Sequence, residues 1–262
     1  MSKDEYKQGS LTLAGTVAMG TGVMIGAGIF ALTGQVAEFA GDLFPLAFLT
    51  AAIISGFSAY SYIKVSNKYP SAGGIAMILQ RAYGPSTVTG SAALLMAFSM
   101  IINESLVART FGTYTLQLFG VEGGPLVPLL AIGLIIMAFV INVAGNQVIG
   151  GVSKVTAILK VGGILIFALI AIWAAGFSFQ PAADGFADST SAGGFLAGVA
   201  LAILAYKGFT TITNSGDEVK QPTRNVGRAI MISLAICTFI YLLVCFAVGS
   251  TLTFWAVVAA KD

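Results

Sequence analysis

The sequence has no histidine and only two cysteines. Histidine and cysteine supply most zinc ligands in proteins, so we expect neither a metal site nor a metal cofactor. Cys237 and Cys245 lie eight residues apart in one apolar segment, which separates them by about 12 Å along the axis of a helix. A disulfide needs Cα atoms within about 7 Å of each other. We therefore predict two free thiols.

Charged residues are also scarce, at 9% of 262 residues, whereas hydrophobic residues make up 57%. A soluble domain carries about 25% charged residues. The composition therefore excludes a water-facing globular fold and predicts a polytopic membrane protein surrounded by lipid. The formal net charge of +2 gives no reason to expect a nucleic-acid partner.

Long apolar runs are abundant, and a membrane-spanning helix needs about 20 mostly apolar residues. We predict an all-α fold with one transmembrane domain over residues 1–262. Its seven spans are expected at about residues 11–32, 43–63, 87–119, 126–143, 152–175, 193–213 and 229–253. The third span is long enough to cross the bilayer with a strong tilt.

The few charges alternate between the two sides of these spans. Basic residues occupy the N-terminus and every second loop, at Lys3, Lys7, Lys64, Lys68, Arg81, Lys154, Lys220, Arg224 and Arg228. Acidic residues occupy the alternate loops, at Glu38, Asp42, Glu122, Asp184 and Asp188. The positive-inside rule then places the N-terminus in the cytoplasm. We expect a multi-pass protein of the cell (plasma) membrane, with its last residues and Lys261 outside.

The stretch "GTGVMIGAGIF", residues 20–30, places four glycines in the first span. A dinucleotide site needs G-x-G-x-x-G after a strand, and the Walker pattern G-x-x-x-x-G-K-[S/T] is absent, so we expect no nucleotide cofactor. Two interpretations remain open. Gly22 and Gly26 form a GxxxG helix-packing face, or the helix breaks near Ile25–Gly28 and its freed backbone groups bind a ligand.

A second interruption occurs in the sixth span, at "ILAYKGFTTITNSG". Lys207 and Gly208 break the apolar pattern there, and this span runs antiparallel to the first. Two broken antiparallel helices offer N–H groups to a carboxylate and C=O groups to an ammonium group. The pair of interruptions therefore predicts a site for a zwitterion, as an amino acid is.

Four charged residues lie well inside predicted spans, away from their ends, where a charge is costly and indicates function. Glu104 and Arg109 are about 140° apart around a helix, so each either pairs with another span or faces an aqueous path. Lys160 either extends toward the cytoplasm or carries a proton. Lys207 either repels a cationic substrate side chain or binds carbonyls of a neighbouring helix.

Four stretches resemble, in the same order, motifs of the amino acid–polyamine–organocation transporters. They are "GVMIGAGIFALTG", "YPSAGGIAMILQRAYG", "INVAGNQVIGGVSKVTAILK" and "AYKGFTTITNSGDEVKQPTRNVGRAI". The resemblance implies the five-plus-five inverted-repeat fold of the sodium-coupled leucine transporter, with discontinuous first and sixth spans. Family members have about twelve spans, so seven spans leave the second repeat incomplete.

The resemblance also implies which residues bind substrate. Backbone N–H groups of the first span would hold the carboxylate, carbonyls near the sixth-span break would hold the amino group, and Tyr206 and Phe209 would lie near the side-chain pocket. The residues concerned are Ile25, Gly26, Ala27, Gly28, Leu204, Ala205, Tyr206, Lys207, Gly208 and Phe209. Lys160 matches a lysine that links protonation to opening in proton-coupled members.

The expected function is secondary active transport of amino acids by alternating access, with a proton as the coupling ion in symport or exchange. No nucleophile–base arrangement indicates an enzyme, and no repeated filter indicates a channel. The chain departs from the family pattern at Ile203 and Leu204, where aromatic residues are common, and at Gly227, where a proline is usual. The alternative is a truncated or non-transporting subunit that needs a partner or the missing spans.

Overall fold

The computed structural model describes residues 11–71, 73–121, 123–143, 146–176 and 191–251. Part of the predicted charge pattern lies outside these residues, at Lys3, Lys7, Glu122, Asp184, Asp188 and Lys261. The chain divides into two compact units, Met1–Ile75 with Thr156–Asp262 and Ala76–Val155. The described residues form helices and no strand, as the sequence predicts, and the protein is an all-α polytopic membrane protein.

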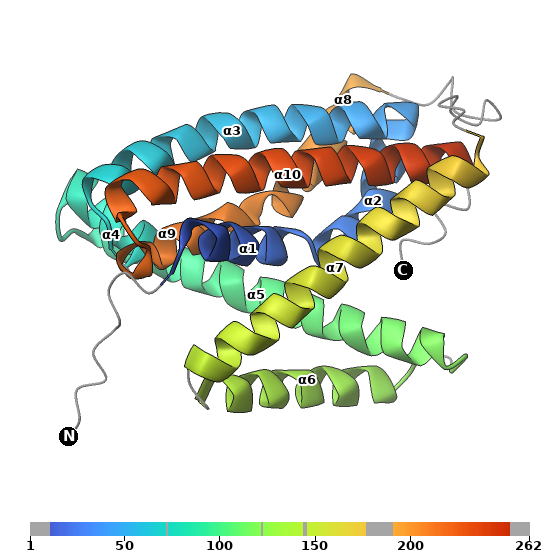
Figure 1. Ribbon diagram of the computed structural model, residues 1–262, viewed down its shortest axis with the longest axis horizontal. Helices are drawn as coiled ribbons and strands as arrows, with labels where there is room; N and C mark the ends of the chain where they lie inside the picture. Colours follow the sequence, from blue (N-terminus) through green and yellow to red (C-terminus); the bar gives the residue numbers. More distant parts are fainter. Residues whose placement is uncertain (1–10, 72, 122, 144–145, 177–190, 252–262) are drawn as a thin grey trace. The chain divides into compact units, whose positions relative to one another are not determined.

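The first unit contains both interrupted helices (Figure 1). Its elements are α1 (Leu13–Met24), α2 (Ala27–Ala40), η1 (Gly41–Leu43), α3 (Phe44–Lys68), α8 (Ala192–Ala205), η2 (Lys207–Phe209), α9 (Thr210–Asn214), η3 (Gly216–Glu218) and α10 (Pro222–Thr251). The end of α7 (Asn146–Ala174) also belongs to this unit. Residues 146–155 of α7 are assigned to the other unit.

Capping side chains fix where two of these helices begin. The Thr12 side chain accepts a hydrogen bond from the Gly15 N–H at the start of α1, and the Ser191 side chain accepts one from the Gly194 N–H at the start of α8. Such caps stabilise a helix start by about 1 kcal/mol because they satisfy backbone donors that the helix itself leaves free.

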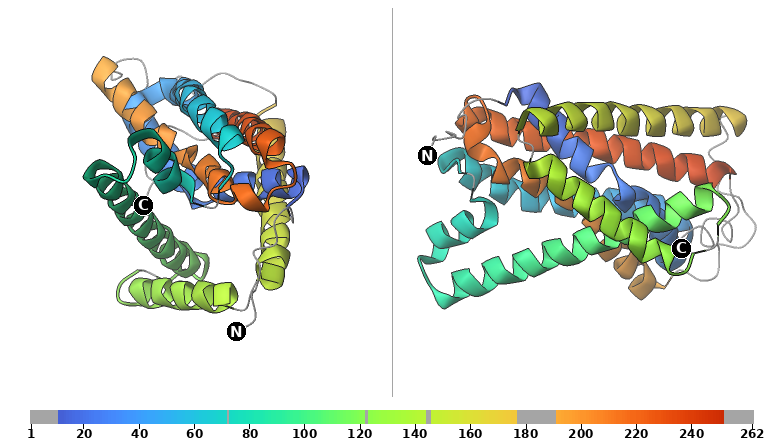
Figure 2. Two further views of the ribbon diagram at one scale, coloured as in Figure 1. Left: turned by 90° about the vertical axis from the view of Figure 1, so that its left-hand side faces the viewer. Right: turned by 90° about the horizontal axis from the view of Figure 1, so that it is seen from below.

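The long helices α3 and α10 pack side by side, and the left-hand view of Figure 2 looks along them. The second half of the first interrupted helix, α2, packs on α8, while the first half, α1, packs on η2 and α9. Since the first half of one helix meets the second half of the other, the two interrupted helices run antiparallel. Glycine permits this approach: a Cβ on Gly194 would lie 2.6 Å from the Phe39 carbonyl oxygen, and one on Gly198 2.9 Å from the Ala40 Cβ.

One buried cluster joins these helices. Its largest fully buried side chains include Tyr206, Tyr241 and Phe48, from three different helices. Cys237 and Cys245 are buried in the same cluster as free thiols, which confirms the prediction from their spacing.

Beyond α9, the chain pairs with the start of α1. The Leu11 N–H donates to the Glu218 carbonyl and the Lys220 N–H donates to the Leu11 carbonyl, both at 2.8 Å. Nearby, a Cβ on Gly216 would lie 2.9 Å from the Ser71 carbonyl oxygen. The backbone at Leu11, at residues 216–220 and at Ser71 therefore meets at this end of the unit.

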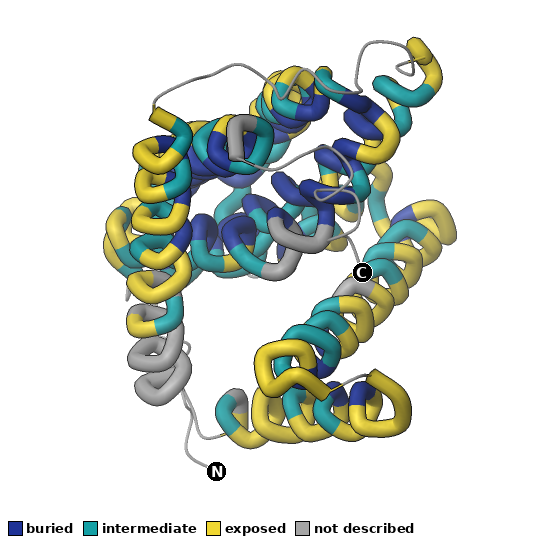
Figure 3. The backbone as a smooth tube through the Cα atoms, turned by 90° about the vertical axis from the view of Figure 1, so that its right-hand side faces the viewer, coloured by how far each residue is buried: buried dark blue, intermediate teal, exposed yellow. Residues whose placement is uncertain are grey.

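The second unit contains α5 (Thr87–Leu118) and α6 (Leu126–Val143), which pack on each other. Gly112 makes this possible, because a Cβ there would lie 2.5 Å from the Val127 carbonyl oxygen. Most of the remaining surface of α5 and α6 is exposed and apolar (Figure 3). The short α4 (Gly74–Tyr83) begins in the first unit and ends in the second.

Four described segments are long and apolar enough to cross a membrane: Leu32–Lys68, Thr87–Leu118, Ala192–Asn214 and Pro222–Gly249. Shorter apolar helices occupy Leu13–Met24, Leu126–Ile141 and Ile158–Ala174. Each of the seven predicted spans overlaps one of these segments. The assignment of seven spans in one domain stays a prediction, because a helix that is broken or short does not by its length establish a crossing.

Candidate functional site

The first interruption lies between α1 and α2, within the residues where the sequence predicts it. Helix α1 ends at Met24, and the Ile25 N–H still donates to the Thr21 carbonyl at 2.7 Å. Ile25 and Gly26 then leave the helical conformation, with φ/ψ of −83°/97° and −163°/−150°. Helix α2 restarts at Ala27. Its first-turn N–H groups have no acceptor within their own helix and carry partial positive charge.

The second interruption has a different form. Helix α8 ends at Ala205, and Lys207–Phe209 form a single 3₁₀ turn before α9 continues. The tighter turn changes the hydrogen-bond pattern, so the Tyr206 N–H lies within reach of the Ile203 and Leu204 carbonyls. The predicted discontinuity at Lys207 and Gly208 is confirmed. The backbone there forms a 3₁₀ turn and does not become extended as it does at the first interruption.

The two interruptions meet at Gly208. A Cβ on Gly208 would lie 2.7 Å from the Met24 Cγ and 2.9 Å from the Met24 backbone nitrogen. Real side chains do not approach backbone so closely, so only glycine allows η2 to lie on the end of α1. Gly20 has a related role one turn earlier, because a Cβ there would lie 2.5 Å from the Ile212 Cδ1. Gly20 is therefore a packing residue of α1.

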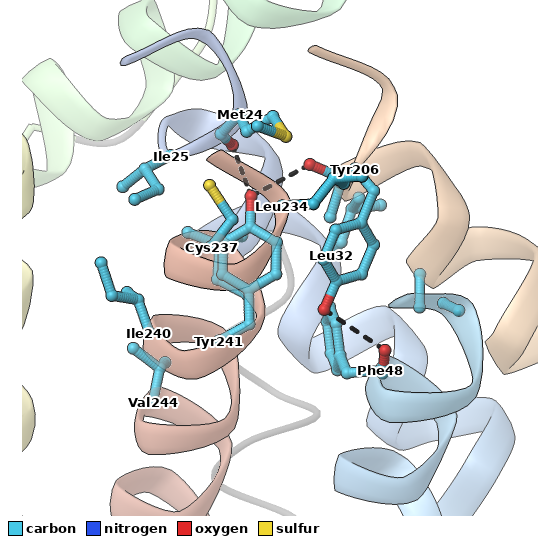
Figure 4. Packing of buried hydrophobic residues seen from close by; sticks show 14 of the residues in the cluster. Met24, Ile25, Leu32, Phe48, Tyr206, Leu234, Cys237, Ile240, Tyr241 and Val244 are labelled. Atoms are coloured by element: carbon cyan, nitrogen blue, oxygen red, sulfur yellow. Dashed lines mark hydrogen bonds between the residues drawn. The ribbon is translucent and has the colours of Figure 1, made fainter. Parts of the chain in front are cut away.

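A tyrosine from α10 joins the two helix ends (Figure 4). The Tyr241 hydroxyl lies 2.6 Å from the Met24 carbonyl oxygen and 3.0 Å from the Ala205 carbonyl oxygen. These residues are the last of α1 and α8, so their carbonyls belong to the partially negative ends of both helices. The phenol ring is fully buried, 5.1 Å from the Tyr206 ring centroid.

Lys160, on α7, reaches the first interruption. Its Nζ donates to the Gly22 carbonyl at 3.4 Å and lies 3.6 Å from the position that a Cβ on Gly26 would take. The side chain therefore extends to the break in the first helix rather than away from it. Its ammonium group faces the carbonyl end of α1, where a positive charge is favoured.

Two aromatic side chains that the resemblance places near a substrate pocket are packed against α3 in the buried core. The Tyr206 hydroxyl donates to the Phe48 carbonyl of α3 at 3.3 Å. Phe209 is buried, with its ring edge-on to Tyr62 at a centroid distance of 5.4 Å. Leu204 is half exposed. Both rings are thus held by α3, and only their backbone lies at the second interruption.

The remaining predicted residues divide between the two units. Lys207 is half-buried in η2, and its carbonyl accepts a hydrogen bond from the Thr210 hydroxyl at 3.0 Å. Ala27 and Gly28 lie in the first turn of α2. Glu104 and Arg109 lie on α5 in the second unit, where both are exposed and no ion pair joins them.

Tyr241 is the site residue that the sequence analysis missed. A tyrosine near the middle of the apolar seventh span was the available signal, because a buried hydroxyl usually has a hydrogen-bond partner. The sequence alone does not say which backbone groups that partner would be. Only the meeting of three helices defines them.

Two interrupted antiparallel helices that meet at their carbonyl ends, in an all-α polytopic membrane protein, are a feature of many secondary-transporter folds. The sequence profile of the amino acid permease family matches residues 11–258, and the chain belongs to this family. Family membership places it among permeases rather than enzymes.

Individual relatives are similar over most of the chain. It is 31% identical to the inner membrane transport protein YbaT of Escherichia coli over 234 residues, covering 88% of this chain and 54% of that protein. It is 29% identical to the branched-chain amino acid permease BcaP of Lactococcus lactis, covering 91% of this chain and 55% of that protein. It is 28% identical to the vacuolar cationic amino acid transporter 2 of Arabidopsis thaliana, covering 94% of this chain and 41% of that protein. The chain thus spans about half the length of the curated relatives it matches.

Proposed function

We propose that this protein is a secondary active transporter of amino acids, driven by a proton gradient through symport or exchange. The observation that carries the proposal is the meeting of the two interrupted helices. Their carbonyl ends, at Met24 and Ala205, lie against the same hydroxyl, and the N-terminus of α2 lies directly beyond the first break. An α-amino acid carries the two charges that these groups favour.

In this proposal the substrate carboxylate binds the N–H groups of Gly26, Ala27 and Gly28. The amino group binds carbonyls that the two interruptions free, at the ends of α1 and α8 and in the residues before Gly208. The relatives' names support an amino acid as substrate, since they include a branched-chain amino acid permease and cationic amino acid transporters. Transport itself would follow from rocking of the helices about this fixed site.

Lys160 would be the coupling residue. Its Nζ contacts the Gly22 carbonyl, so its charge helps to hold α7 against the end of α1. Loss of the proton would remove the attraction between the ammonium group and the carbonyl end of the helix. Protonation and the position of α1 would then be linked, which is what proton coupling requires.

The test is uptake into liposomes that contain the purified protein, with a mixture of radiolabelled amino acids and an imposed pH gradient. Lys160→Ala should abolish gradient-driven accumulation and keep counterflow, because exchange of bound substrate needs no net proton movement. Lys64→Ala is the matched control, because this lysine lies near the end of α3 and not at either interruption. It should keep both gradient-driven accumulation and counterflow.

Three other results would each contradict part of the proposal. Unchanged accumulation in Lys160→Ala would remove Lys160 as the coupling residue. Saturable binding without uptake would favour a non-transporting subunit that needs a partner. Currents without saturation or counterflow would favour a channel. We further propose that the protein lies in the plasma membrane. Its basic loops support a cytoplasmic N-terminus.

A further inference from the structure

The Tyr241 hydroxyl has one proton and two acceptors. A phenol donates a single hydrogen bond, and backbone carbonyls only accept. At 2.6 Å from the Met24 oxygen and 3.0 Å from the Ala205 oxygen, the hydroxyl is within reach of both but donates fully to one at a time. The two helix ends therefore share one O–H donor, which cannot make a full hydrogen bond to both carbonyls at once.

Two nearby carbonyls of the second interruption have other donors. The Ile203 carbonyl accepts the Tyr206 N–H at 3.1 Å, and the Lys207 carbonyl accepts the Thr210 hydroxyl at 3.0 Å. On the first interruption, the Gly22 carbonyl accepts from Lys160. The carbonyls of Met24 and Ala205 differ from these, because they belong to opposite helices and share one donor, the Tyr241 hydroxyl.

Both carbonyls also lie where a positive charge is most favoured. They are the last carbonyls of α1 and α8, whose partially negative ends point at one spot from two directions. A neutral phenol offers these partial negative charges only the dipole of one O–H group. An ammonium group offers three donors and a full positive charge at the same place.

We infer that the Tyr241 hydroxyl is a placeholder for the amino group of the substrate. In the empty protein it holds the two helix ends together. When an amino acid binds, its ammonium group takes over the carbonyls of Met24 and Ala205, and the hydroxyl gives them up. Tyr241 thereby acts as a positioning residue that sets how strongly the site prefers ligands with an amino group. This inference rests on the proposed amino acid site.

The placeholder role predicts that removal of the Tyr241 hydroxyl strengthens amino acid binding. Tyr241→Phe keeps the buried ring and removes the competing hydroxyl. The empty protein should melt at a lower temperature, because two buried carbonyls lose their donor. Amino acid binding should become at least threefold tighter, because the amino group no longer displaces anything.

The experiment measures binding to the purified protein in nanodiscs, by thermal shift and by radioligand displacement. The probes are L-alanine, L-leucine and L-arginine, each paired with the same acid without its α-amino group: propanoate, 4-methylpentanoate and 5-guanidinopentanoate. The readout is the ratio of affinities within a pair. Tyr241→Phe should raise this ratio at least threefold, since only the amine-bearing member competes with the hydroxyl.

Ser233→Ala is the matched control. Ser233 is a buried hydroxyl on the same helix that donates to the Val17 carbonyl of α1 at 3.3 Å, about two turns from Tyr241. Its loss should lower the melting temperature of the empty protein without changing the ratio. A change of the ratio as large as in Tyr241→Phe would show general loosening and overturn the placeholder role.

A second substitution covers the case in which Tyr241→Phe does not fold. Site-specific replacement of Tyr241 by 3-fluorotyrosine keeps the shape and makes the hydroxyl a stronger donor. Amino acid affinity should then fall, while affinity for the acids without an amino group stays the same.

Opposite or absent changes overturn the inference. If Tyr241→Phe weakens amino acid binding, the hydroxyl is a direct ligand of the substrate. If neither Tyr241 variant changes the ratio, the hydroxyl only supports the fold. If the wild-type protein binds none of the amino acids, the proposed function fails and the placeholder role fails with it. The proposed function therefore stands or falls on the wild type, and the placeholder role on the variants.

Discussion

At the scale of single residues, the two glycines at the crossing of the broken helices have different physical tasks. Gly26 has φ of −163°, which is extended backbone that any residue adopts, and a Cβ there would meet nothing closer than 3.6 Å. Gly208 would instead place a Cβ 2.9 Å from backbone of Met24. The conformation of the first break does not need glycine, whereas the crossing does.

This difference gives a prediction. Gly208→Ala should destabilise the protein by about 1–3 kcal/mol, as overpacking against backbone does. Gly26→Ala should change stability by less than about 0.5 kcal/mol and should weaken amino acid binding, because its methyl group would add bulk beside the first N–H groups of α2, 3.6 Å from the Lys160 Nζ. Thermal unfolding in detergent and radioligand binding measure the two effects.

Gly56→Ala on α3 is the control for this pair, since a Cβ there meets nothing within 4 Å. Alanine in an open helical position should leave stability equal or higher. Destabilisation by Gly26→Ala as large as by Gly208→Ala would mean that the first break itself depends on glycine.

At the scale of elements, backbone pairing helps to close the end of the first unit where α1 begins. The Leu11 N–H donates to the Glu218 carbonyl at the end of η3, and the Lys220 N–H donates to the Leu11 carbonyl. Gly216 keeps the loop that contains Ser71 against that segment, because a Cβ would lie 2.9 Å from the Ser71 oxygen and 3.1 Å from its nitrogen. The first and sixth spans are therefore tied at this end.

Gly216→Ala should loosen this closure. The added methyl group has only backbone to displace, so the loop must move and the pairing of Leu11 with the segment after η3 weakens. We expect hydrogen exchange of the Leu11 and Lys220 amides to rise by about tenfold, which corresponds to ~1.4 kcal/mol of local opening free energy. Gly163→Ala on α7, where a Cβ meets nothing within 4 Å, should leave both rates unchanged. Equal rates in the two variants would contradict the role of Gly216.

The expected departures from the family pattern also become clear at this scale. Gly227, where the family usually has proline, lies close to α3: a Cβ there would lie 2.7 Å from the Ile63 Cγ2, and its N–H donates to the Asn67 Oδ1 at 3.3 Å. Proline has neither the space nor the N–H for this contact. The start of α10 is therefore joined to α3 directly.

At the scale of the whole molecule, charge placement determines orientation. Arg224, at the start of α10, and Glu38, near the end of α2, are both exposed and belong to the basic and acidic sets of loops. Loops that carry an excess of Lys and Arg generally stay on the cytoplasmic side of a membrane. These two positions should therefore lie on opposite sides of the membrane.

Cysteine labelling tests this orientation. Glu38→Cys should react with a membrane-impermeant maleimide in intact cells, and Arg224→Cys should react only after permeabilisation. The wild-type protein is its own control, because Cys237 and Cys245 are fully buried and should stay unlabelled. Labelling of both new cysteines from the same side would refute the predicted topology.

Much of the architecture was predictable from local sequence. Apolar runs of span length predict the helices, because the bilayer interior admits few other folds. The interruptions at Gly26 and at Gly208 were predictable for a similar reason, since glycine and charge disturb an apolar helix at identifiable positions. The direction of the Tyr206 and Phe209 side chains was not, because both rings are held by contacts with α3, which lies far away in the sequence.

The sequence by itself determined the class of protein, the helices and the two breaks, because composition and helix-breaking residues act locally. Only the tertiary structure decided how the breaks are used. It placed Lys160 against the Gly22 carbonyl and Tyr241 between Met24 and Ala205, and these residues come from four separate helices. A hydrogen bond depends on distances of a few tenths of an ångström, and such distances between remote residues follow from packing alone.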